Sequence, residues 1–154
     1  MKAKELMTAS VVSCGPDTNL AAVTELMWKH DCGFVPITNE RGEVLGVVTD
    51  RDICIALGTR NVMASGLRAR DVMSRQVVGC APEDDELSVL HTMQEHRIRR
   101  LPVQGIGGVL LGILSLNDLA RAAVRLPEGH VLRRTFIETF ARICAPRHRH
   151  VAAA

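Results

Sequence analysis

Two short segments of the chain combine a glycine, a hydroxyl side chain and a carboxylate at one fixed spacing. Residues 46–52 read GVVTDRD and residues 112–118 read GILSLND. Glycine admits a close backbone approach, and a hydroxyl beside the free amides of a helix start is suited to contact a phosphate. The Asp lies three residues on, one helical turn away on the same side. Its carboxylate can accept hydrogen bonds from two vicinal sugar hydroxyls, each contributing roughly 1.5–3 kcal/mol.

The same residues also fit an ordinary helix start. Thr49 and Ser115 would then be N-caps, and Asp52 and Asp118 would complete a capping box. For a single occurrence this is the more common interpretation, because capping boxes are frequent. The duplication of the pattern, with its flanking glycine, favours the binding interpretation.

An internal repeat must position these two segments. An offset of 66 residues aligns residues 3–53 with residues 69–119 without a gap, and the identities include many Gly and Pro positions with specific backbone demands. Each copy predicts a short Met-bearing helix, a strand, a helix, two strands and a closing helix. We therefore expect an α/β (α+β) fold of two pseudo-symmetric β-α-β-β-α repeats, residues 1–60 and 66–124, packed together because neither buries its sheet alone.

The remainder, residues 127–154, predicts an amphipathic helix followed by a basic tail. Leu132, Phe136 and Phe140 recur every four residues, with charged residues elsewhere. Such a stripe most often packs on its own domain. The alternatives are a homodimer contact or a docking site for a separate effector. The basic residues 147–150 are interpreted as a solvated tail.

Composition excludes several classes of protein. No apolar run is long enough to span a bilayer, and the net charge of +2 and aromatic content of 3% give little support for nucleic-acid binding. The five cysteines form no CxxC pair, which argues against disulfides and thiolate zinc sites and favours a reducing cytoplasm. His30 and His96 occupy matching helix ends, where a cation near a helix C-terminus explains them without a metal. Because no GxSxG or HExxH pattern is present, we expect no enzyme.

These residues resemble the CBS domain, and the tandem pair resembles the Bateman module, as found in stand-alone bacterial CBS-domain proteins. The resemblance covers residues 1–124 and rests on Leu6-Met7 and Val72-Met73, on the run RRLPV at 99–103, and on the two Gly…Thr/Ser-x-x-Asp segments. Bateman modules bind AMP, ADP, ATP or S-adenosylmethionine, and sometimes NAD. They commonly associate into flat, disk-like dimers.

The resemblance also implies roles for particular residues. Thr49 and Ser115 would contact phosphate, and Asp52 and Asp118 would hold ribose hydroxyls. The base would lie between strand residues, namely Cys14, Phe34, Val35 and Pro36 in the first copy and Cys80, Arg100, Leu101 and Pro102 in the second. The second copy alone carries nearby cations, Arg99 and Arg100, so unequal affinities are expected. An ordinary solvated edge is the alternative for Arg97, Arg99 and Arg100.

The sequence thus predicts a regulatory adenine-nucleotide sensor for signal transduction, with AMP, ADP or ATP ahead of NAD or S-adenosylmethionine. We expect no output domain fused to the repeats, so the expected partner is a separate effector protein or a second copy of the chain in a homodimer. Two weaker alternatives remain. One is a nucleic-acid binder that uses the basic tail, and the other is a small nucleotide-handling enzyme.

Overall fold

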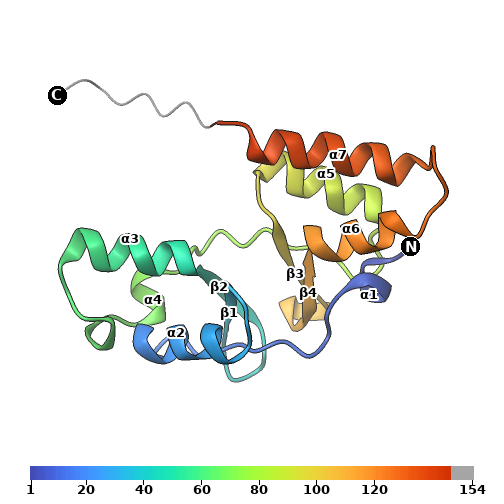
Figure 1. Ribbon diagram of the computed structural model, residues 1–154. Helices are drawn as coiled ribbons and strands as arrows, with labels where there is room; N and C mark the ends of the chain where they lie inside the picture. The colour runs from blue at the N-terminus through green and yellow to red at the C-terminus, as the bar shows by residue number, and fades with distance from the viewer. Residues whose placement is uncertain (147–154) are drawn as a thin grey trace.

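The computed structural model describes residues 1–146 as two similar halves that lie side by side (Figure 1). The first half contains α2 (Leu20–Lys29), β1 (Phe34–Thr38), β2 (Val44–Thr49), α3 (Asp50–Arg60), the short helix η1 (Ala64–Gly66) and α4 (Ala69–Val72). The second contains α1 (Ala3–Leu6), α5 (Glu86–His96), β3 (Arg100–Gln104), η2 (Ile106–Gly108), β4 (Leu110–Ser115), α6 (Leu116–Val124) and α7 (Val131–Cys144).

Each half is built on one antiparallel hairpin. β1 pairs with β2 and β3 with β4, and both ladders shift register at the same place, after Ile37 and after Val103. Gly42 (φ 77°) and Gly108 (φ 79°) adopt the left-handed backbone conformation in the two turns, which favours glycine at both positions. The hairpins and turns predicted from the repeat are confirmed.

The first predicted strand of each repeat is reduced to a single bridge. Cys14 bridges Ile37 in parallel, and Cys80 bridges Val103 in the same way. Two backbone hydrogen bonds hold the first bridge, Cys14 N to Pro36 O (3.2 Å) and Thr38 N to Cys14 O (2.9 Å). This first strand cannot continue its pairing with the hairpin, because a proline follows the bridging cysteine by two residues in each copy.

The two halves exchange their N-terminal helices. Ala3 of α1 is fully buried in the core of the second half, and Ala69 of α4 is fully buried in the core of the first. Backbone hydrogen bonds fix both helices, from Ala3 N to Asp84 O and from Ala69 N to Thr18 O, each 2.8 Å long. The predicted boundaries 1–60 and 66–124 therefore delimit repeats of sequence, whereas each packed half takes its first helix from the other repeat.

Two separate apolar cores support the hairpins. The apolar stripe predicted for α2 is buried at Leu20, Val23 and Met27. In the second half, α5 buries Val89, Leu90 and Met93, and the core there is larger because α7 packs on α5 and α6 (Figure 1). Both cores lie against the hairpins and hold the ends of β2 and β4, where the two Thr/Ser-x-x-Asp segments begin.

The predicted C-terminal helix is present and packs on its own chain. Leu132 and Thr139 of α7 are fully buried, and Ile143 is nearly so. The basic residues 147–150 lie outside the described residues. Within residues 1–146, no helix has the length and apolar character needed to cross a membrane.

Candidate functional site

Thr49 and Asp52 form a closed pair where β2 gives way to α3. The Thr49 hydroxyl donates a hydrogen bond to Oδ2 of Asp52 (2.7 Å), and the Thr49 amide donates to the same oxygen (2.9 Å). The Asp52 amide donates in return to the Thr49 hydroxyl oxygen (3.2 Å). The capping box considered from the sequence is therefore present, and it holds the carboxylate in one orientation.

Ser115 and Asp118 repeat this arrangement at the start of α6, with one difference. Oδ2 of Asp118 accepts from the Ser115 hydroxyl (2.5 Å) and amide (2.8 Å), while Oδ1 accepts from the guanidinium of Arg121. At the equivalent position the first copy has Ile55, and Oδ1 of Asp52 accepts no hydrogen bond from any residue in the described range. The first copy thus presents an open carboxylate oxygen, and the second presents one already neutralised.

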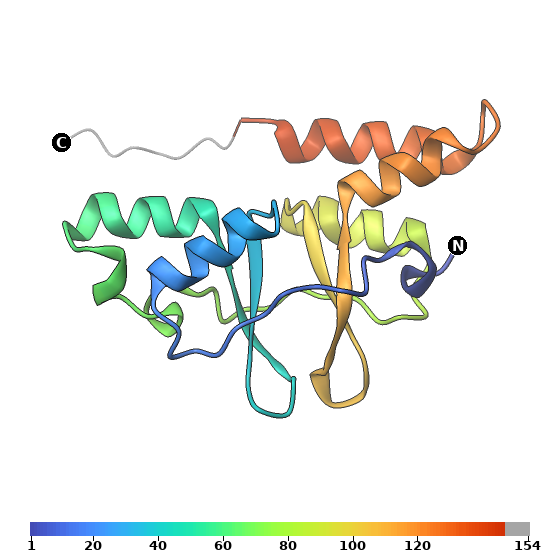
Figure 2. The same cartoon turned by 60° about the horizontal axis from the view of Figure 1, so that its bottom comes forward.

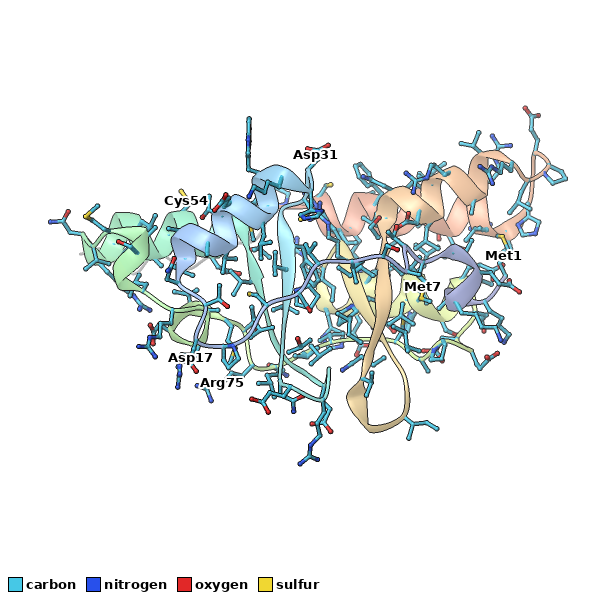
Figure 3. The ribbon with its side chains drawn as sticks, turned by 90° about the horizontal axis from the view of Figure 1, so that it is seen from below. Met1, Met7, Asp17, Asp31, Cys54 and Arg75 are labelled. Atoms are coloured by element: carbon cyan, nitrogen blue, oxygen red, sulfur yellow. The ribbon has the colours of Figure 1, made fainter. Side chains whose placement is uncertain are left out.

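The repeated glycines Gly46 and Gly112 admit a close backbone approach by the protein itself. A Cβ at Gly46 would lie 2.8 Å from both Sδ of Met73 and the Ser74 carbonyl oxygen. At Gly112 the corresponding distances to Sδ of Met7 and the Thr8 carbonyl oxygen are both 2.7 Å. Figure 3 shows Met7 beside the second hairpin. The close backbone approach predicted for these glycines is thus made by the exchanged segments of the protein itself.

A hollow of about 240 Å³ lies beside the open carboxylate, between α3 and α4. We call it the Asp52 hollow; it is lined by Asp52, Ile55, Ala56, Thr59, Arg60, Asp71, Val72 and Met73. Four of these side chains are apolar and four are polar or charged, Asp52 among the latter. Such a site can bind a polar sugar edge together with a flat apolar ring. The contribution of Met73 from the exchanged segment was not predicted.

A larger hollow of about 500 Å³ lies where the first half meets the second. We call it the Trp28 hollow; it is lined by Thr24, Met27, Trp28, Asp31, Cys32, Gly33, Asp50, Ile53 and Arg100. Arg100 comes from the second repeat, so this cation reaches the rim of the first half. Figure 3 shows Asp31 at the end of α2 near the boundary between the halves.

The predicted cation pair Arg99 and Arg100 is separated by the structure. Successive side chains of an extended chain point to opposite sides. Arg100 lines the Trp28 hollow, whereas Nη2 of Arg99 donates to Sγ of Cys144 at the end of α7 (4.0 Å). The guanidinium of Arg97 donates to the carbonyl of Ala145. Of these three arginines, Arg100 is therefore the one positioned to face a ligand held between the halves.

Most of the residues assigned to the base are buried. Phe34, Val35, Pro36, Leu101 and Pro102 are all buried, and none of them lines either hollow. The two cysteines of this set differ in exposure, because Cys14 is half-buried and Cys80 is buried. Burial raises the pKa of the Cys14 thiol, and it raises that of Cys80 to about 11, so both thiols are neutral near pH 7.

No cluster of three or more His, Cys, Asp or Glu side chains suited to a metal ion occurs within residues 1–146. His30 and His96, the pair considered from the sequence, lie at the ends of α2 and α5 in separate halves.

Comparison with known proteins identifies the family. A family model for the CBS domain matches residues 3–59 and again residues 69–125, which is more than half of the chain. The chain belongs to the CBS domain family. The two matches follow the internal repeat and include both Thr/Ser-x-x-Asp segments.

Two relatives differ in how much of their own length this chain matches. Hypoxic response protein 1 of Mycobacterium tuberculosis is 32% identical over 148 residues, which cover 94% of both chains. An uncharacterized protein of Methanopyrus kandleri, MK0525, is 29% identical over 115 residues, which cover 75% of this chain and 59% of that protein. The CBS-domain chain is thus similar to a whole protein in one case and to part of a longer one in the other.

Solved structures confirm the fold of a CBS domain pair. Hypoxic Response Protein I, with two coordinated zinc ions, is 29% identical with a TM-score of 0.73, covering 82% of this chain and 100% of that one. The CBS domain pair of protein MJ0100, in complex with 5′-methylthioadenosine and S-adenosyl-L-methionine, is 20% identical with a TM-score of 0.72. That alignment covers 79% of this chain and 94% of the other.

Proposed function

We propose that this CBS domain pair is a regulatory sensor that binds an adenine nucleotide and carries out no reaction. The observation that supports it most strongly is the state of Asp52. One carboxylate oxygen is fixed by the cap, and the other accepts no hydrogen bond from any described residue at the edge of the Asp52 hollow. An oriented carboxylate beside a wall that is half apolar suits vicinal ribose hydroxyls next to a base.

The phosphate is proposed to extend from Thr49 toward Arg100. The first amides of α3 already have acceptors: Asp50 N donates to Gly33 O (3.3 Å), and Arg51 N donates to the Asp50 carboxylate (2.7 Å). A phosphate therefore depends on a side-chain cation. Arg100 lines the Trp28 hollow together with Asp50, the residue that follows Thr49, so it is the cation we propose for the phosphate.

Ligand binding of this kind would connect the two halves. The ribose contact comes from the first repeat and the phosphate contact from the second. A bound nucleotide therefore favours the arrangement of the halves in which both contacts form at once. A ligand shifts such an equilibrium only by its differential affinity for the two arrangements. We propose AMP, ADP or ATP as the ligand, ahead of NAD or S-adenosylmethionine. The MJ0100 complex supports only the capacity of the fold to hold adenosyl compounds.

The two copies are proposed to bind unequally, with the first the stronger. Arg121 already donates to Oδ1 of Asp118 and competes there with ribose hydroxyls, whereas no described residue pairs with Asp52 in this way. We further propose that the protein acts in the cytoplasm, where its five free cysteines stay reduced, and as a homodimer or with a separate effector.

A thermal-unfolding panel tests this function. AMP, ADP, ATP, NAD and S-adenosylmethionine are added separately, with GMP and GTP as matched controls, and each sample is then checked by chromatography for conversion. A ligand at 100 times its Kd stabilises the folded state by about 2.7 kcal/mol, so at least one adenine compound raises Tm and is recovered unchanged. Turnover would support the enzyme alternative, and no stabilisation by any adenine compound would contradict the sensor.

A further inference from the structure

The two repeats differ in charge on the exposed face of the helix that follows each Thr/Ser-x-x-Asp segment. Subtracting the repeat offset of 66 places Arg121 at the position of Ile55 and Arg125 at the position of Thr59. Ile55 and Thr59 both line the Asp52 hollow. The second half thus has two arginines where the first half has one apolar and one neutral polar side chain.

The elements around these positions are the same in both halves. α4 packs against α3 in the first half, and α1 packs against α6 in the second. Figures 1 and 2 show α6 leading directly from β4, with α1 beside it. The exchanged helices and the residues after them supply equivalent side chains, Asp71 and Met73 in the first half and Glu5 and Met7 in the second. One architecture therefore carries two walls of different chemistry.

The arginine of the Asp52 hollow itself is placed differently. Arg60 corresponds to Leu126, and its Nη2 donates to the backbone carbonyl of Asp71 (3.1 Å). Arg60 follows Asp52 by eight residues, about two helical turns, and holds the exchanged helix α4. It does not reproduce the position that Arg121 has beside the carboxylate of the second copy.

Arg121 is anchored by a buried carboxylate and remains accessible. Its Nη2 donates to Oδ1 of Asp118, while Oδ2 of the same carboxylate accepts the two hydrogen bonds of the Ser115 cap. Asp118 is 8% exposed, whereas the side chain of Arg121 is 67% exposed. Within residues 1–146 the Arg121 side chain makes no other hydrogen bond or ion pair. A guanidinium has N–H donors on several edges, so the remaining donors are available to a ligand.

Arg125 lies one helical turn after Arg121 and is also exposed. Its backbone keeps helical geometry (φ −77°, ψ −9°), so the two side chains share one face of α6. No hydrogen bond or ion pair of the Arg125 side chain occurs among the described residues. Arg133 of α7 donates to the carbonyl of Leu126 (3.0 Å), which brings a third guanidinium to the turn after α6. Like charges at this spacing destabilise a helix, and a bound anion relieves that repulsion.

Carboxylates and guanidinium groups select opposite ribose chemistry. A carboxylate oxygen accepts hydrogen bonds from ribose hydroxyls, whereas a guanidinium binds a phosphate through paired hydrogen bonds. In dinucleotide-binding folds the same change, from an acidic residue to an arginine, separates recognition of a ribose from recognition of its 2′-phosphate. The first site offers the open oxygen of Asp52, and the second offers Arg121 and Arg125.

We propose that the second site binds an adenine nucleotide whose ribose carries a phosphate on its 2′ or 3′ oxygen, and that Arg121 and Arg125 hold this phosphate. The inference rests on the proposed nucleotide function, because the Ser115 cap must place the sugar at the start of α6. The first site takes an unmodified ribose, since Ile55 supplies no charge there and a phosphate would meet the carboxylate of Asp52. The chain thus holds two different nucleotides at once.

Four ligands that differ in where phosphate is attached test the assignment. AMP and ADP carry phosphate on the 5′ oxygen alone, whereas adenosine 2′,5′-bisphosphate and adenosine 3′,5′-bisphosphate also carry one on the ribose edge. ADP matches the bisphosphates in the number of phosphates. AMP is titrated first by calorimetry, and the other three are then titrated into AMP-saturated protein. We expect at least one bisphosphate to bind at least about tenfold more tightly than ADP, as expected for an added charge-assisted contact.

Arg121→Ile is the test variant, because it gives the second copy the residue of the first. Asp52 keeps its cap beside Ile55, so Asp118 should keep its own cap in this variant, and circular dichroism checks the fold. Arg121→Ile should weaken binding of the bisphosphate at least about tenfold. Arg142→Ile is the control, since it removes the same charge from an exposed position of α7 and should bind as the wild type does.

Three results would overturn the proposal. The first is that neither bisphosphate binds the AMP-saturated wild type more tightly than ADP. The second is an equal bisphosphate affinity in Arg121→Ile and the wild type, and the third is an equal loss in Arg142→Ile. AMP binding that persists in any of these cases leaves the proposed sensor intact, whereas no binding by any of the four ligands refutes both.

Discussion

Replacing Gly46 by Ala separates a structural role for the repeated glycines from a ligand-binding role. Gly46 has ordinary extended backbone geometry in β2, so alanine introduces no backbone strain there. The added methyl group would lie 2.8 Å from the Ser74 carbonyl oxygen and from Sδ of Met73. The side chain can move aside, but the carbonyl belongs to the exchanged backbone that bridges β2.

The expected cost follows from that contact. Val47 N donates to Ser74 O (3.1 Å) and Ser74 N donates to Val47 O (3.0 Å), so moving the carbonyl weakens both hydrogen bonds. Overpacking of this kind costs about 1–3 kcal/mol, and each weakened hydrogen bond adds up to about 1 kcal/mol. We expect Gly46→Ala to lower the free energy of unfolding by about 2–3 kcal/mol.

Gly58→Ala is the matched control, because Gly58 lies in α3 and an added methyl group there would have no neighbouring atom within 4 Å. Alanine in place of glycine inside a helix stabilises by roughly 0.5–1 kcal/mol. Urea unfolding of both variants is followed by far-UV circular dichroism. The reasoning is refuted if Gly46→Ala is as stable as the wild type, or if Gly58→Ala is the more destabilised of the two.

Three further predictions concern stability and thiol chemistry. Leu132→Ala leaves a cavity under α7 and should lower the free energy of unfolding by about 2–4 kcal/mol in urea titrations; no change would mean that α7 contributes nothing to the core. The pKa of Asp85 lies below its usual range, first because its carboxylate accepts a hydrogen bond from the backbone of Ser88. The stability that the ionised Asp85 gives to the folded state is therefore lost as the pH falls through that lowered pKa. Asp85→Asn keeps a capping oxygen that does not titrate, so its Tm should fall less than that of the wild type between about pH 5 and pH 2; parallel Tm curves would contradict this. At about pH 8, iodoacetamide should modify exposed Cys54 much faster than Cys80, whose pKa of about 11 keeps it protonated, and mass spectrometry after timed quenching would reveal the opposite order.

Sequence repetition was sufficient to predict the hairpins, the helices beside them and the capping boxes. Each depends on residues close together in the chain, such as Gly42 in its turn or Thr49 three residues before Asp52. The helix α7 was predicted, but its buried face differs from the predicted stripe of Leu132, Phe136 and Phe140. Leu132, Thr139 and Ile143 are buried, whereas Phe140 is 49% exposed.

The exchange of α1 and α4 could not be predicted in the same way. Met7 and Met73 occupy equivalent positions in equal repeats, so either could serve either core, and only the path of the connecting chain decides. The difference between Ile55 and Arg121 is visible in the sequence, because each follows the Asp of its repeat, Asp52 or Asp118, by three residues. That Arg121 donates to the carboxylate of Asp118, however, could not be established from the side-chain identities alone.

The most direct test of nucleotide sensing is isothermal titration calorimetry of the wild type, Asp52→Asn and Asp118→Asn with AMP, ADP and ATP. Asparagine keeps a capping oxygen and removes the charge, so a lost charge-assisted contact of roughly 1.5–3 kcal/mol should weaken binding at least about tenfold in Asp52→Asn. Because Arg121 already engages Asp118, the second variant should bind the stronger site nearly as the wild type does. No heat with any of the three nucleotides, or equal binding by all three proteins, would contradict a nucleotide site at Asp52.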